Sequence, residues 1–173
     1  LPYTTLFRSV KAYQIALDKS PQSELALKYH KALKLSGKDE QAASALKTWL
    51  EAHPGDVNIR LVLASTYHVA GRMGDAIQQY REVLTYKPDD YMALNDLAWL
   101  IYEKNKDPEA LELAERAHNT HPERVEALDT YGWILVQEGQ AVKGLLLLNS
   151  AVETAPGALE IAYHIAVALE RNG

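Results

Sequence analysis

The sequence contains no cysteine, which excludes a disulfide framework and a cysteine-based metal site. It has no apolar run near the roughly 20 residues that a membrane-spanning helix needs, and it shows no signal peptide. Lys and Arg form no block or stripe and the formal net charge is −5, so nucleic-acid binding is not expected. Because 47% of the 173 residues are hydrophobic, the chain can form a folded body.

Motifs of the common enzyme classes are also missing. The sequence has no glycine-rich phosphate loop, nucleophile elbow or His-Glu metal helix. His118 and His121 have a spacing that could serve a metal. However, His121 precedes Pro122 as His53 precedes Pro54, which indicates a solvated turn. We therefore predict a protein that is not an enzyme, with no catalytic residue, no metal site and no cofactor.

Four sets of residues recur with a spacing of 34 positions. The first set is Pro54, Pro88, Pro122 and Pro156, and the second is Gly37, Gly71, Asn105, Gly139 and Gly173. The third is Ala42, Ala76, Ala110 and Gly144, and the fourth is Ala64, Ala98, Gly132 and Ala166. A fixed period of this length predicts stacked pairs of antiparallel helices.

Each set has a structural role in such a pair. Glycine at the end of the first helix adopts a left-handed backbone conformation at little cost, and Asn105 is expected to take that conformation in its repeat. Proline ends the second helix. Short residues such as Gly132 and Gly144 allow the paired helices to approach closely. His30 stands where the other repeats have Ala or Gly, so close packing in that repeat is in question.

This pattern resembles the tetratricopeptide repeat (TPR) family from residue 23 to the end of the chain. The resemblance implies an all-α TPR solenoid, a right-handed superhelix of antiparallel helix pairs with about nine helices. Repeats are expected at residues 23–56, 57–90, 91–124 and 125–158. Residues 10–22 are then the second helix of a truncated repeat, and residues 159–173 the first helix of another. Residues 2–9 (PYTTLFRS) resemble a translated sequencing adapter, so residues 1–9 are excluded from the fold.

The hydrophobic spacing sets the expected helix limits. We predict helices at 10–19, 24–36, 39–52, 57–70, 73–86 and 91–104, with Asp56 and Asp90 as N-caps. Asp107 before Pro108 signals another helix start. The last helix is expected to leave an uncovered apolar face, formed by Ile161, Ile165, Ala166 and Leu169.

The resemblance also implies where a partner would bind. In TPR proteins the first helices line a concave groove, and the family's inward positions map a candidate partner-binding groove onto this chain. Its residues are Asn95, Trp99, Tyr102, Glu103, Glu126, Asp129, Trp133 and Tyr163. Aromatic rings beside carboxylates and amides suit a peptide segment or a sugar ring. The alternative is that Trp99 and Trp133 only pack between repeats. The clamp with which co-chaperone members hold terminal carboxylates is absent.

Four stretches are similar to a narrower group. They are residues 94–103 (LNDLAWLIYE), 109–117 (EALELAERA), 127–139 (ALDTYGWILVQEG) and 160–169 (EIAYHIAVAL). Together they resemble the carboxy-terminal part of bacterial TPR lipoproteins linked to the PEP-CTERM/exosortase system. That resemblance implies an exopolysaccharide or envelope assembly and a location in the bacterial envelope or periplasm, with the cytoplasm as the alternative.

Three functions are compatible with these features. The leading hypothesis is a non-catalytic scaffold that binds a peptide or protein partner in its groove. The second is direct binding of a polysaccharide by Trp99 and Trp133. The third is a repeat region that regulates an enzyme encoded outside this chain.

Overall fold

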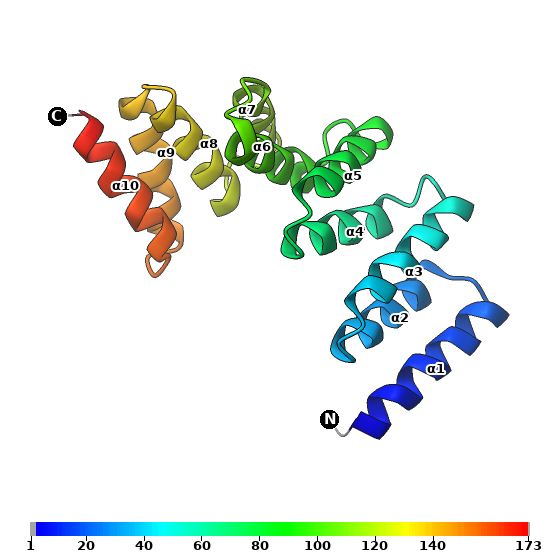
Figure 1. The fold of residues 1–173 in the computed structure, drawn as a ribbon. Coiled ribbons are helices and arrows are strands. Elements are labelled where there is room, and N and C mark those ends of the chain that lie inside the picture. Colours follow the sequence, from blue (N-terminus) through cyan, green and yellow to red (C-terminus); the bar gives the residue numbers. More distant parts are fainter. Residues whose placement is uncertain (1–2, 173) are drawn as a thin grey trace. The chain divides into compact units, whose positions relative to one another are not determined.

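The computed structural model describes residues 3–172, with side chains from residue 9 to residue 171, and contains ten α-helices and no strand in that range (Figure 1). Leu1, Pro2 and the expected turn glycine Gly173 lie outside the described residues. The first helices of the pairs are α2 (Ser23–Leu35), α4 (Val57–Val69), α6 (Tyr91–Asn105), α8 (Val125–Gln137) and α10 (Leu159–Asn172). The second helices are α1 (Tyr3–Lys19), α3 (Asp39–Ala52), α5 (Met73–Tyr86), α7 (Glu109–Thr120) and α9 (Ala141–Thr154). This architecture confirms the all-α repeat fold expected from the spacing.

The chain divides between Tyr86 and Lys87 into two compact units. In unit 1, α2 packs against α1 and α3, and α4 packs against α5. In unit 2, α6 pairs with α7 and α8 with α9, while α10 packs on α9. The first helices of unit 2 also contact their neighbours, α6 with α8 and α8 with α10. No helix in the described range is long and apolar enough to span a membrane.

Helix ends follow the expected turn chemistry in three of the four complete pairs. Gly37, Gly71 and Gly139 have positive φ angles of 71°, 72° and 78° and follow the C-cap residues of α2, α4 and α8. Asp56 and Asp90 each accept a hydrogen bond from a backbone N–H of the first turn, at 3.2 Å in both helices. Asp107 accepts one from the N–H of Glu109 at 3.0 Å.

The prediction for Asn105 is wrong. Asn105 is the last residue of α6, and Lys106 takes the left-handed conformation with φ 54°. Proline disfavours helical backbone angles in the residue before it, so α7 begins only at Glu109, after Asp107 and Pro108. When the repeats are aligned, α6 ends two residues later than α4 and α8. The Lys106 ammonium lies 4.3 Å from the centre of the Tyr102 ring, where it stabilises this turn.

The expected apolar end is only partly present. Ile161 was expected to be uncovered, but it is 3% exposed and packs with Leu128, Val136 and Leu148 between α8, α9 and α10. The residues that α10 does expose include Leu169 and Ala166, as expected. Helical spacing explains the difference, because Ile161, Ile165 and Ala168 point to one side of α10 and Ala166 and Leu169 to the other.

Helices α8 and α9 approach each other closely at Gly132 and Gly144. A methyl group built on Gly144 would lie 2.5 Å from the carbonyl oxygen of Gly132 and 2.5 Å from Cγ2 of Val136. The equivalent residues of the preceding pairs, Ala64 with Ala76 and Ala98 with Ala110, are fully buried. Short side chains therefore lie at the crossing of each of these pairs.

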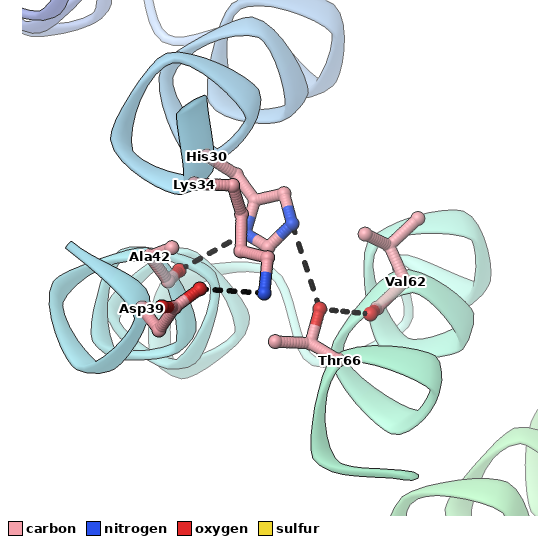
Figure 2. Close-up of polar contacts among 6 residues, drawn as sticks. All are labelled: His30, Lys34, Asp39, Ala42, Val62 and Thr66. Carbon is pink, nitrogen blue, oxygen red and sulfur yellow. Dashed lines mark hydrogen bonds and ion pairs between the residues drawn. The ribbon is translucent and has the colours of Figure 1, made fainter. Parts of the chain in front are cut away.

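His30 occupies this crossing in the pair formed by α2 and α3 (Figure 2). Its side chain is 8% exposed, and its Nδ1–H donates to the carbonyl oxygen of Ala42 at 3.2 Å. Nε2 lies 3.5 Å from Oγ1 of Thr66, whose hydroxyl donates to the Val62 carbonyl. The larger side chain is thus accommodated by a hydrogen bond to the facing helix, and the pair remains closely packed.

We expect Gly144→Ala to destabilise the fold. Overpacking a tight contact typically costs about 1–3 kcal/mol, part of which is offset by the higher helix propensity of Ala. Gly74→Ala is the matched control, because Gly74 lies in α5 with open space around it and the gain in propensity is about 1 kcal/mol at most. Urea unfolding measures both. A Gly144→Ala protein as stable as Gly74→Ala would contradict the close contact.

We also expect acid to weaken the contribution of His30. Burial lowers the pKa of His30, the bond to Ala42 opposes this, and the Lys34 ammonium lowers the pKa further. In the unfolded chain His30 therefore becomes protonated near pH 6.5, whereas in the folded protein it stays neutral to a lower pH. Stability from neutral His30 is complete above that pH and is lost as the pH falls below it. The difference in unfolding free energy between the wild type and His30→Ala should accordingly shrink from pH 7.5 to pH 5. A constant difference would show that His30 titrates alike in both states.

Candidate functional site

Four of the predicted groove residues are aromatic, and three of them, Trp99, Trp133 and Tyr163, lie on different first helices of unit 2. Trp99 is on α6, Trp133 on α8 and Tyr163 on α10, and these helices contact one another in that order. Both indoles are half-buried, whereas Tyr163 is 61% exposed. Trp99 and Trp133 therefore contribute to packing between first helices and also reach the surface. We call this surface of α6, α8 and α10 the first-helix face.

The ring of His164 lies next to those of Trp99, Trp133 and Tyr163. His164 stacks on Trp133 with ring centres 4.2 Å apart and an angle of 19° between the planes. The centre of its ring lies 6.3 Å from that of the Trp99 ring, and the ring centres of Tyr163 and Trp133 are 6.1 Å apart. These four residues form an aromatic cluster in which His164, at 3% exposed, is the buried member.

Asp129 holds His164 in place. His164 Nδ1 lies 2.7 Å from Oδ1 of Asp129, and the nitrogen must carry the hydrogen because the carboxylate only accepts. Asp129 and Trp133 are four residues apart on α8, so both project toward α10 from one face of the helix. Asp129, predicted as a groove residue, thus fixes the orientation of the ring that supports Trp133.

Asn95 lies four residues before Trp99 on α6 and is 7% exposed. Its Nδ2 donates to Oδ1 of Asp96 at 3.2 Å. Its Oδ1 is buried without a hydrogen-bond partner among the described residues. Asn95 is therefore a packed residue beneath the first-helix face and not an exposed contact.

The remaining predicted residues are engaged elsewhere. Tyr102 is 3% exposed and donates its hydroxyl hydrogen to Oε1 of Glu138 at 3.1 Å, at the end of α8. Burial first, and then this bond to Glu138, raises the pKa of Tyr102 to about 12. Exposed Glu103 lies 3.7 Å from the Lys106 ammonium. Exposed Glu126 accepts a hydrogen bond from the hydroxyl of Tyr91 at 3.2 Å.

His164 was missed by sequence reasoning. The family's inward positions include Tyr163 and do not include the adjacent His164. The available signal was chemical, since Asp129 and His164 are 35 residues apart, one more than the repeat length, and lie on neighbouring first helices. A carboxylate and a histidine at such positions can bond across the helix interface.

The two other histidines considered from sequence do not form a metal site. No group of three or more His, Cys, Asp or Glu side chains in the described range is arranged to hold a metal ion. His118 lies within α7, not in the turn, with its ring 5.7 Å from that of Tyr131. His121 directly follows α7, and its ring lies 4.9 Å from that of Tyr91.

The first helices of unit 2 carry more carboxylates than basic groups. The acidic residues of α6, α8 and α10 are Asp96, Glu103, Glu126, Asp129, Glu160 and Glu170. The basic ones are Lys104 and Arg171. An excess of negative charge on one set of helices attracts positively charged partners and repels terminal carboxylates.

Comparison with known proteins identifies the family. The sequence profile of the tetratricopeptide repeat matches residues 36–85 and 70–124, which together span more than half of the chain. The chain belongs to the tetratricopeptide repeat family. The TPR repeat-containing protein PA4667 of Pseudomonas aeruginosa is 28% identical over 156 residues, which are 86% of this chain and 26% of that protein. The chain thus spans about a quarter of the length of this relative.

Solved TPR structures share the fold. The crystal structure of MamA has a TM-score of 0.76 and 21% identity, covering 87% of this chain and 82% of that one. YrrB, described as a TPR protein with an unusual peptide-binding site, has a TM-score of 0.77 and 17% identity, covering 94% and 84%. A TPR protein from Parabacteroides merdae has a TM-score of 0.79 and 17% identity, covering 97% and 67%. At these identities the likeness shows the fold alone.

Replacing Asp129 by Ala should destabilise the protein. The buried His164 N–H would lose its acceptor, and an unsatisfied buried donor costs about 1–3 kcal/mol. Glu126→Ala is the matched control, because Glu126 is an exposed carboxylate on the same helix. Asp129→Ala should lower the free energy of unfolding in urea more than Glu126→Ala does. Equal values for the two variants would show that the buried bond between Asp129 and His164 contributes no more stability than the exposed bond between Tyr91 and Glu126.

Proposed function

We propose that this chain is a non-catalytic scaffold that binds a peptide or protein partner on the first-helix face of unit 2. The observation that supports it best is the aromatic cluster, in which Trp99, Trp133 and exposed Tyr163 reach the surface from three adjacent helices. Large aromatic side chains dominate the energetics of protein interfaces. The TPR family generally supplies such scaffolds, and the YrrB relative is described as having a peptide-binding site.

The rigidity of the cluster favours this role. His164 is held by Asp129 and stacks on Trp133, so that indole is fixed before a partner arrives. A surface ordered in advance loses less conformational entropy on binding. The carboxylates of α6, α8 and α10 favour a partner segment that contains Lys or Arg.

The cluster suits a peptide better than a sugar ring. His164 covers one face of Trp133, so the two indoles do not form a bare platform for stacked sugars. Tyr163 is the ring with the greatest free surface. A peptide can place an apolar side chain beside Tyr163 and a basic one near the carboxylates.

The biological setting is a separate proposal, based on the resemblance of residues 94–169 to PEP-CTERM-associated lipoproteins. We infer a role in a bacterial exopolysaccharide or envelope assembly, at the envelope or in the periplasm. Regulation of an enzyme by this repeat region is the competing hypothesis. A catalytic domain encoded beside the repeats in the complete gene would favour that alternative.

Selection of peptides from a displayed library against the whole chain tests the binding function. We expect enriched peptides to combine apolar and basic residues, and Tyr163→Ala to weaken their binding at least about tenfold, as for a residue central to an interface. Fluorescence anisotropy measures the affinity, and circular dichroism verifies that the variant is folded.

Leu146→Ala is the control, because Leu146 is 66% exposed on α9 and lies outside the first helices. Its binding should match the wild type. Equal loss in both variants, or no loss in Tyr163→Ala, would contradict the proposed face. Binding on a glycan array without any peptide binding would replace the peptide partner by a carbohydrate.

A further inference from the structure

Unit 1 contains a cavity of about 500 Å³ between α1 and α3, with Tyr29 of α2 among its lining residues. This volume lies within the range of about 300–1,000 Å³ typical of ligand pockets. The residues that α1 contributes begin at Gln14, so all of them follow the segment that resembles an adapter. We call it the α1–α3 pocket.

Short side chains on α3 leave this space open. Ser44, Ala45, Thr48 and Ala52 line the pocket from one face of the helix. One repeat later, α5 has longer side chains at the same four positions, namely Gln78, Gln79, Glu82 and Tyr86. Tyr86 packs there against Gly55, and Gln79 accepts a hydrogen bond from Arg60 at 3.0 Å. The corresponding contacts cannot form around α3.

Aromatic and aliphatic groups make much of the wall. Trp49 is 8% exposed, its ring stacks on His53 with centres 4.0 Å apart, and its N–H donates to Asp56. The indole N–H is therefore already bonded, and the ring offers apolar surface to the pocket. Leu17 and Pro21 of the facing side add to this surface.

The charge at the pocket has one sign. Asp18 is the carboxylate in the lining, and none of the lining residues is Lys or Arg. Oδ1 of Asp18 accepts a hydrogen bond from Nε2 of Gln14 at 2.7 Å, which leaves its other oxygen available. The charge of Asp18 also acts on Tyr29, whose pKa is raised by burial first and by Asp18 second. Asp18 and Tyr29 both line the pocket.

We propose that the α1–α3 pocket is a second peptide-binding site, distinct from the first-helix face. It takes an aromatic or aliphatic side chain against Tyr29 and Trp49, next to a Lys or Arg that pairs with Asp18. The hydroxyls of Ser44 and Thr48 and the amide of Gln41 can bond to the peptide backbone. An acidic peptide is disfavoured because no cation in the lining would balance its charge.

Two dipeptide probes test the proposal on the whole ¹⁵N-labelled chain. Acetyl-Phe-Lys-amide should shift the backbone resonances of Ala45 and Thr48 and bind about fivefold more tightly than acetyl-Phe-Glu-amide, as expected for an exposed ion pair. Asp18→Asn should abolish that preference. Ser44→Phe fills the cavity from an exposed position and should remove both sets of shifts.

Glu112→Phe is the matched control, because Glu112 occupies the same register on α7. It should leave the binding of both probes unchanged. The pocket is refuted if the probes shift only residues of α6, α8 and α10, a result that would still agree with the first-helix face. It is also refuted if shifts around Ala45 persist in Ser44→Phe. Equal binding of both probes to the wild type would overturn the role of Asp18, and the Asp18→Asn result stands even if Ser44→Phe does not fold.

Discussion

The close contact between the two helices of each pair is the constraint on which the rest of the structure depends. At Gly144 the contact leaves no room for a β-carbon and at Gly132 only a tight space, and the residues at the equivalent positions of α4 to α7 are fully buried alanines. This contact sets the spacing of each pair. Stacking of the pairs in unit 2 then brings Trp99, Trp133 and Tyr163 to adjacent positions on successive first helices. The surface that we propose for binding is therefore a consequence of core packing.

Two buried histidines show how the repeat tolerates polar groups. His30 at a helix crossing and His164 between first helices are both less than 10% exposed, and each bonds to an acceptor on another helix. Buried polar groups are acceptable when they are hydrogen-bonded. His30 serves packing within unit 1. His164 connects packing to the surface, since it orients Trp133 and is covered by aromatic neighbours.

Periodicity predicts the fold closely because the turns and helix contacts of every complete repeat are formed by residues at the same offsets. The limits of α3 and α5 agree with the sequence to the residue, and those of α2, α4 and α6 within one. The helix predicted at 10–19 is longer, because α1 begins at Tyr3, within the residues that were excluded from the fold. The other exceptions occur where neighbours override the pattern. Pro108 delays α7 and moves the left-handed turn from Asn105 to Lys106. The side of α10 that holds Ile161 turns inward, which a count of apolar residues does not reveal.

The candidate site was less predictable than the fold. Family positions included Trp99, Trp133 and Tyr163, whose helices α6, α8 and α10 contact one another in that order. They did not distinguish exposed Tyr163 from buried Tyr102 and Asn95, because burial depends on the helices that flank each position. The bond from His164 to Asp129 and the α1–α3 pocket were not foreseen. Both depend on distances between helices, which side-chain periodicity does not specify.

Accessibility of the indoles is the most direct test of the central claim that Trp99 and Trp133 form part of a surface. Three variants, each retaining one Trp and replacing the other two by Phe, can be compared by acrylamide quenching of fluorescence. We expect stronger quenching of Trp99 and Trp133 than of Trp49, which is 8% exposed and bonded to Asp56. Quenching of Trp99 and Trp133 no stronger than that of Trp49 would show that both are sealed in the core, and the proposed binding face would be wrong.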